Sequence, residues 1–118
     1  MKDNFSILDY LNDILDSIIS IKEFLVGIDF DLFCKDKKTQ YAVIRALEII
    51  GEASKKVPKE VRDIYTDIPW RSISGMRDKL IHDYFGVDIE VVWNTANEKI
   101  LSLEDKIKNI ISNYQSKA

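Results

Sequence analysis

Large apolar residues recur along the first quarter of the chain with a regularity that constrains the fold more than any other feature. They stand at alternating spacings of four and three residues: Ile7, Leu11, Ile14, Ile18, Ile21, Leu25 and Ile28. This spacing places all of them on one side of an α-helix of about six turns. The charged residues fall mostly on the other side: Asp9, Asp13, Asp16 and Lys22. The pattern predicts a long amphipathic helix that packs against other elements.

The last quarter of the chain carries a second stripe of this kind, again with spacings of three and four: Trp93, Ala96, Ile100, Leu103, Ile107, Ile110 and Tyr114. Between the two stripes, residues 37–57 also follow a helical pattern, and Asp36 is the expected N-cap. We predict that the buried side of this middle helix consists of Val43, Leu47, Ile50, Ser54 and Val57, with Ala46 and Ala53 beside them. Long helices with uninterrupted apolar sides pack on each other or within a bundle.

The first connection, residues 29–38, is polar and has no clear period. We expect an irregular loop there, whose apolar side chains pack on the core: Phe30, Leu32 and Phe33. Pro58 ends the middle helix and opens a short helical turn over residues 59–65.

A further helix is predicted to begin at Pro69, because proline in a first turn gives up an amide that has no partner there. Ser74 and Gly75 favour a break within this helix, and Gly86 favours its end. Asp88 is the expected N-cap of the last helix.

Only two prolines and four glycines interrupt the 118 residues, which favours helices over a turn-rich β architecture. We therefore predict one all-α domain over residues 1–118, a bundle of four main helices plus a short one. The net charge of −3 provides no general basic field for nucleic acids. Any contact with a phosphate backbone would need a local basic cluster.

The cellular setting is predicted from cysteine content and from hydropathy. Cys34 is the only cysteine, so no internal disulfide is possible and a reducing compartment is expected. A role for Cys34 as a reactive thiol is not favoured, because the only histidine is far from it in the sequence. The N-terminal residues do not form a secretory signal, and no apolar run approaches the ~20 residues that span a bilayer. We expect a soluble cytoplasmic protein with no membrane partner.

The stretch Arg77-Asp-Lys-Leu-Ile-His82-Asp-Tyr84 holds the only histidine of the chain. If this stretch is helical, Asp78 and His82 are four residues apart on one face, so the carboxylate can orient the imidazole. Arg77 and His82 are five residues apart and diverge by about 140° and about 7.5 Å along the axis. One helix therefore does not bring the two side chains together directly.

These residue types suit phosphoryl transfer without a metal ion. A histidine can take a proton from an RNA 2′-hydroxyl or give one to the leaving 5′-oxygen. An arginine offers a planar, permanently charged donor array to the phosphate oxygens in the transition state. Concerted acid and base work needs two histidines, and an isologous homodimer supplies the second. His82, Arg77 and Asp78 are thus the candidate catalytic and supporting residues.

A structural role for the lone histidine is the competing interpretation, since a histidine on a helix more often packs than reacts. A metal site is not expected, because one histidine and one distant cysteine cannot form a zinc ligand set. No glycine-rich phosphate loop is present either, so no cofactor is predicted.

The polar side of the middle helix carries Arg45, Glu48 and Glu52 at spacings of three and four, on a single face. This face is either an ordinary solvated surface or one that orders groups at an interface or site. The sequence alone leaves both interpretations open.

Three blocks of the chain together resemble the HepT-like toxins of the HEPN superfamily. They are Gly75 to Asp88, which contains the motif, Arg45-Ala-Leu-Glu48-Ile-Ile-Gly-Glu52-Ala, and Pro69-Trp70-Arg71. The likeness extends in order over essentially the whole chain.

The resemblance implies a helical domain that dimerises, so that two Arg-x-x-x-x-His motifs line a shared cleft. It implies a metal-independent endoribonuclease, the toxin of a toxin–antitoxin pair, with Arg77 and His82 as the catalytic residues. It also implies a nucleotidyltransferase antitoxin that attaches AMP to Tyr84.

The alternative is a non-catalytic HEPN module that binds nucleotide or docks onto a nucleotidyltransferase. The acidic balance and the divergence of Arg77 from His82 motivate it. A helical dimerisation protein with no nucleic-acid role is a third interpretation.

Overall fold

The computed structural model describes residues 4–82 and 88–116; the side chains of residues 4, 5, 77 and 79–82 are outside this description. All elements in these ranges are helical, which confirms the predicted all-α class. They are α1 (Asn4–Phe24), α2 (Phe30–Lys35), α3 (Lys37–Lys56), α4 (Lys59–Ile64), α5 (Trp70–His82), α6 (Ile89–Asn94), a π-helical segment η1 (Thr95–Ile100), a 3₁₀ turn η2 (Leu101–Leu103) and α7 (Glu104–Ser116).

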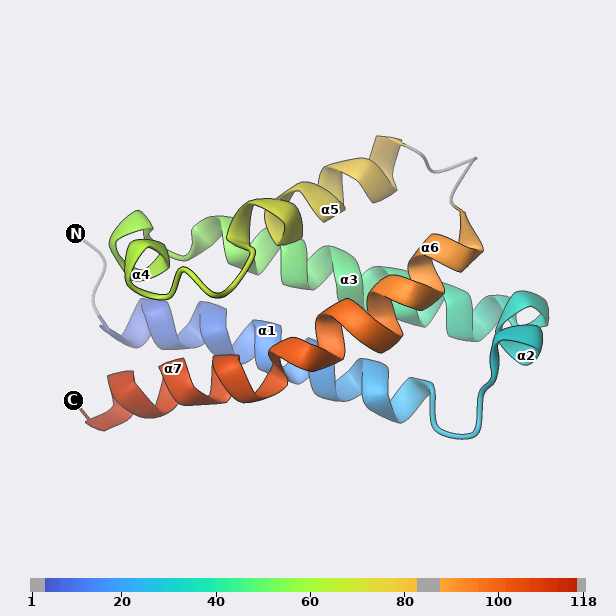
Figure 1. Ribbon diagram of the computed structural model, residues 1–118, viewed down its shortest axis with the longest axis horizontal. Helices are drawn as coiled ribbons and strands as arrows, with labels where there is room; N and C mark the ends of the chain where they lie inside the picture. Colours follow the sequence, from blue (N-terminus) through green and yellow to red (C-terminus); the bar gives the residue numbers. More distant parts are fainter. Residues whose placement is uncertain (1–3, 83–87, 117–118) are drawn as a thin grey trace.

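The long helices pack in a bundle around α3 (Figure 1). α1 packs against α3 and α7, and α5 packs against α3 on the other side. The short helices α2 and α4 lie at opposite ends of the molecule. No helix in the described ranges is long and apolar enough to cross a membrane.

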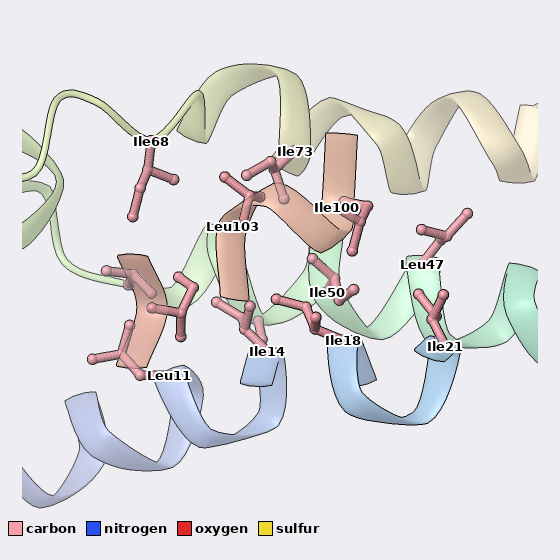
Figure 2. Packing of buried hydrophobic residues seen from close by; sticks show 14 of the residues in the cluster. Leu11, Ile14, Ile18, Ile21, Leu47, Ile50, Ile68, Ile73, Ile100 and Leu103 are labelled. Carbon is pink, nitrogen blue, oxygen red and sulfur yellow. The ribbon is translucent and has the colours of Figure 1, made fainter. Parts of the chain in front are cut away.

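The stripes predicted from the sequence form the core. Figure 2 shows side chains of α1 and α3 interleaved with Ile73 of α5 and with Ile100 and Leu103 of the C-terminal helices. On α1, residues at five of the seven stripe positions are buried: Ile7, Leu11, Ile14, Ile18 and Ile21. Leu25 and Ile28 lie beyond the end of α1, because Gly27 turns the chain with a φ of 73°.

α3 confirms its predicted cap and its predicted buried side. The Asp36 carboxylate accepts from the Thr39 backbone N–H at 3.1 Å and from the Thr39 hydroxyl at 2.6 Å. These hydrogen bonds lower the pKa of Asp36, because they favour the charged carboxylate. Every residue predicted for the buried side is buried, and the Ser54 hydroxyl donates to the Ile50 carbonyl at 2.7 Å. A polar residue is thus accommodated in the core without an unpaired hydroxyl.

The prediction of an irregular loop over residues 29–38 is wrong. α2 forms within it, and the Asp29 carboxylate caps this helix by accepting from the Leu32 N–H at 2.8 Å. Phe33 is fully buried, with its ring centroid 5.2 Å from that of Trp93. Packing on the core therefore stabilises a helix too short to show a period in the sequence.

The predicted break at Ser74 and Gly75 is also wrong. α5 starts at Trp70, directly after Pro69, and runs through both residues without interruption. The indole Nε1 of Trp70 donates to the Tyr65 carbonyl at 2.9 Å and fixes the start of the helix. This anchor and the burial of Ile73 outweigh the low helix propensity of one glycine.

The C-terminal stripe is confirmed, but its helix is not regular. Asp88 caps α6 as predicted, accepting from the Glu90 N–H at 3.0 Å and the Val91 N–H at 3.4 Å. The path then passes through η1 and η2 before α7 begins. Within η1, the Asn97 side-chain amide donates to the Trp93 carbonyl at 3.1 Å, which offers that carbonyl an alternative to the regular helix bond.

Candidate functional site

α5 positions the motif. Its backbone is helical from Trp70 to His82, so Arg77, Asp78 and His82 lie on one helix, as predicted. Thirteen residues span about 20 Å, and the motif occupies the half of α5 that is remote from α4 (Figure 1). The other half is held by buried Trp70 and Ile73. The motif therefore stands at the far end of a helix that is anchored at its start.

Asp78 is tied to α3 by an ion pair that sequence reasoning missed. The Lys55 ammonium is 3.1 Å from each carboxylate oxygen of Asp78. The two side chains are 42% and 52% exposed, so water screens the pair. Twenty-three residues separate them, and no spacing rule links them before the packing of α5 on α3 is known. The orienting role of Asp78 toward His82 stays a prediction, since the helical backbone provides only the spacing of four.

The side chains of Arg77 and His82 and the whole of Tyr84 lie outside the described residues. The catalytic pair and the AMP acceptor therefore stay predictions. The described backbone does fix the relative positions of Arg77 and His82 on α5, about 140° apart around the axis. Their divergence, expected from the spacing, thus applies to the folded chain.

The face of α3 that carries Arg45, Glu48 and Glu52 points away from the core. Arg45 and Glu52 are exposed and Glu48 is half-buried. Glu52 lines a small pocket of about 170 Å³ together with Tyr10 and Asp13 of α1. Glu52 therefore borders α1, whereas Lys55, one turn further along α3, reaches α5. A site-ordering role for this face stays a prediction.

Among the side chains that the structure describes, no three His, Cys, Asp or Glu residues are grouped so as to hold a metal ion. Cys34 is exposed.

The fold is an all-α bundle in which α5 packs on the central α3 and carries Arg77 and His82 in its last turns, and the sequence continues the motif to Tyr84. These features are those of the helical domains of the HEPN superfamily. Residues 14–110 match the family model described as ribonuclease HepT-like. The match covers most of the chain and includes the entire motif, so the chain belongs to the HepT-like family. This confirms the resemblance drawn from the sequence.

Curated relatives agree over nearly their full lengths. A Thermococcus cleftensis protein named "Probable ribonuclease HepT" is 55% identical over 102 residues, covering 86% of this chain and 93% of the relative. The Methanocaldococcus jannaschii protein "Putative RNase MJ0125" is 45% identical over 108 residues, covering 92% of this chain and 93% of the relative. The Caldanaerobacter subterraneus protein "Putative RNase TTE0752" is 46% identical over 102 residues, with 86% and 91% covered. No solved structure matches the chain significantly.

Proposed function

We propose that the protein is a metal-independent endoribonuclease and the toxin of a toxin–antitoxin pair. The observation that carries the proposal is the complete Arg77…His82…Tyr84 motif within residues that match the HepT-like family. The relatives named as ribonucleases support the activity class, because they cover the same residues. The motif occupies the half of α5 remote from α4, and Asp78 within it is exposed, which is compatible with access for a polymeric substrate.

The proposed reaction is an internal transfer at phosphorus. The RNA 2′-oxygen loses its proton to a base and forms a bond to the phosphorus, while the bond from phosphorus to the 5′-oxygen breaks. An acid protonates the leaving 5′-oxygen, so the products are a 2′,3′-cyclic phosphate and a 5′-hydroxyl. His82 serves as acid or base, and Arg77 stabilises the added negative charge on the phosphate.

The proposed active unit is a homodimer. Each chain contains a single histidine, while concerted acid and base catalysis uses two. A two-fold axis beside α5 would set each motif opposite its copy and would bring the Arg77 of one chain near the His82 of the other. Sedimentation equilibrium and the activity of mixed dimers of Arg77→Ala and His82→Ala chains test this arrangement.

The proposed partner is a nucleotidyltransferase antitoxin that silences the toxin in the cytoplasm by attaching AMP to Tyr84. An AMP group two residues from His82 would place a bulky anion beside the site and compete with an RNA phosphate. Mass spectrometry of the Tyr84 peptide after co-expression with a neighbouring nucleotidyltransferase gene should detect added AMP. Tyr84→Phe should abolish the addition and keep the toxin active in the presence of the partner.

The central experiment compares wild-type protein with His82→Ala on RNA in the presence of EDTA. Wild type should cut and leave a cyclic phosphate end, and the variant should lose about 10²–10⁴-fold in rate, the usual contribution of acid–base catalysis. Thermal unfolding serves as the control for folding. Full activity in His82→Ala would remove the catalytic proposal. No cutting by wild type, combined with tight binding to the nucleotidyltransferase, would favour the non-catalytic module instead.

A further inference from the structure

A pocket of about 380 Å³ lies between α4 and the start of α5, at the end of α5 remote from the motif (Figure 1). Its lining includes three basic side chains, Lys59, Arg62 and Arg71, and one acidic side chain, Asp63. Lys59 and Asp63 pair with each other at 2.9 Å. Arg62 and Arg71 have no carboxylate within ion-pair distance in the part of the chain that the structure describes. The pocket thus contains two uncompensated guanidinium groups in a chain of net charge −3.

Arg62 is held in an electrostatically unfavourable setting. Its side chain is half-buried, and its Nε is shut off from solvent with no hydrogen-bond acceptor among the described residues. A cation that loses water without gaining a counter-charge is destabilised. An anion in the pocket, bonded to the other nitrogens of the guanidinium, would compensate for this loss.

The start of α5 adds to the preference for an anion. Arg71 and Ser72 line the pocket and belong to the first turn of α5, where backbone N–H groups have no carbonyl partner within the helix. The aligned peptide dipoles place partial positive charge at the same end. Two guanidinium groups and a helix start favour an anion with several oxygens in fixed geometry, and a phosphate group has this chemistry.

One face of α5 extends from the pocket to the motif. Four positions on it follow one another at spacings of four, three and four: Arg71, Gly75, Asp78 and His82. These four positions form the outer stripe of α5. Arg71, Gly75 and Asp78 are exposed, and nothing lies within 4 Å of where a Cβ on Gly75 would stand. Eleven residues separate Arg71 from His82, a rise of about 16 Å. That distance equals about five nucleotides at the duplex spacing of about 3.4 Å, and fewer in an extended strand.

We propose that the pocket lined by Arg62 and Arg71 binds a phosphate of the RNA strand several nucleotides from the bond that is cut, with the strand lying along the outer stripe of α5. This inference rests on the proposed ribonuclease function for the identity of the strand. It assigns Arg62 and Arg71 to substrate binding and not to the chemical step.

Binding is tested with a 2′-O-methyl RNA of twelve nucleotides, which cannot be cut. The pocket variant is Arg62→Gln/Arg71→Gln, and the control is Lys35→Gln/Lys37→Gln, which removes the same charge beside α2 at the opposite end of the molecule. The pocket variant should bind at least ten-fold more weakly, with a salt dependence reduced by about 0.7 in log–log slope, the value for one lost phosphate contact on a single strand. The control should change binding by less than three-fold. Equal weakening in both variants would reduce the effect to net charge and overturn the proposal.

Cleavage kinetics distinguish a remote binding role of Arg62 and Arg71 from a role in the chemical step. On a twelve-nucleotide RNA, the pocket variant should raise KM about ten-fold and leave kcat near the wild-type value. On a dinucleotide, which cannot reach from His82 to the pocket, wild type and variant should be equal. An equal loss on both substrates would overturn the proposal, since the arginines would then act on the reaction or on the fold. Arg71→Gln alone, at an exposed position, repeats the test if the double variant unfolds.

A free nucleotide carries the same phosphate chemistry, so AMP is used as a competitor. Suppose that AMP binding depends on Arg62 and Arg71 in the same way and that AMP displaces the oligonucleotide completely once it fills the pocket. In that case the pocket is a nucleotide site and the strand proposal is wrong. If wild type cuts no RNA but oligonucleotide binding still depends on both arginines, the ribonuclease function fails and the pocket assignment stands. If cutting is normal and the pocket variant matches the control, the pocket assignment alone fails.

Discussion

Removing the Lys55–Asp78 ion pair should reduce the stability of the fold only slightly and the cleavage rate more strongly. Lys55→Met keeps the apolar stem and deletes the charge, and Asp78→Asn keeps the shape and deletes the charge. Because the side chains are 42% and 52% exposed, the pair contributes about 0.2–1 kcal/mol to the free energy of unfolding. With about 2.1 cal/mol/K of unfolding entropy per residue over 118 residues, either change should lower Tm by about 1–4 °C.

Activity should respond more strongly, if Asp78 orients the imidazole of His82. A displacement of about 1 Å at a reacting group can reduce the rate about 10²-fold, so Asp78→Asn should lower kcat on RNA by roughly 10–100-fold. Lys55→Met should have a smaller effect of the same kind, because it removes the ammonium partner and leaves the Asp78 carboxylate in place.

The double variant and a second ion pair serve as controls for this prediction. If Lys55 acts through Asp78, the activity loss of Lys55→Met/Asp78→Asn should equal that of Asp78→Asn alone. Lys22→Met breaks another ion pair, Lys22–Glu104 at 2.8 Å, whose carboxylate is 13% exposed and keeps Lys108 as a partner. It should lower Tm with unchanged cleavage. Independent losses that multiply in the double variant would refute the coupling. A fall in Tm of ten degrees or more would refute the assignment as a screened surface pair.

Three further predictions concern the scaffold. Ile50→Ala should reduce the free energy of unfolding by about 2–5 kcal/mol in urea titrations, because Ile50 is fully buried and truncation leaves a cavity; a loss below 1 kcal/mol would contradict the packing. Gly75→Ala should stabilise the protein by about 0.5–1 kcal/mol in the same assay, since the position is helical, exposed and sterically open. The hydrogen bonds from Lys108 and then Lys22 hold the pKa of Glu104 below its usual 4.5, so its stabilisation is complete above pH 4.5 and is lost as the pH falls through the lower folded-state pKa. Glu104→Gln should therefore lower Tm at pH 7 but match wild type at low pH, and a pH-independent difference would contradict the linkage.

The sequence predicted the parts of the fold in which the apolar repeat of three and four residues continues over several helical turns. The stripe of α1 and that of the C-terminal helices each extend over several turns, so apolar burial alone specifies their helical state and their inner face. The caps Asp36 and Asp88 were also predictable, because a carboxylate before a helical pattern has one common use there. These signals come from residues that are close together in the sequence, and the structure contains the helices and caps that they predict.

Features that depend on contacts between distant segments were not predictable. α2 contains six residues and forms because Phe33 packs against Trp93, sixty positions later in the chain. The continuity of α5 through Gly75 depends on the anchor between Trp70 and Tyr65. Lys55 acquires its link to Asp78 only when α5 lies on α3. In each case the deciding contact lies outside any sequence window that has a period.

The outer stripe of α5 shows where sequence reasoning about the site ends. The spacing of Arg71, Gly75, Asp78 and His82 is visible in the chain, but a polar stripe by itself is indistinguishable from a solvated helix face. Two tertiary facts distinguish this stripe: Arg71 lines the pocket between α4 and the start of α5 at one end, and Lys55 of α3 pairs with Asp78 near the other. Arg71 shares this pocket with the half-buried Arg62 of α4, and neither arginine has a carboxylate within ion-pair distance among the described residues. The proposed RNA strand would account for the arginine pair at one end of the stripe, and the motif at the other end would hold the bond that is cut.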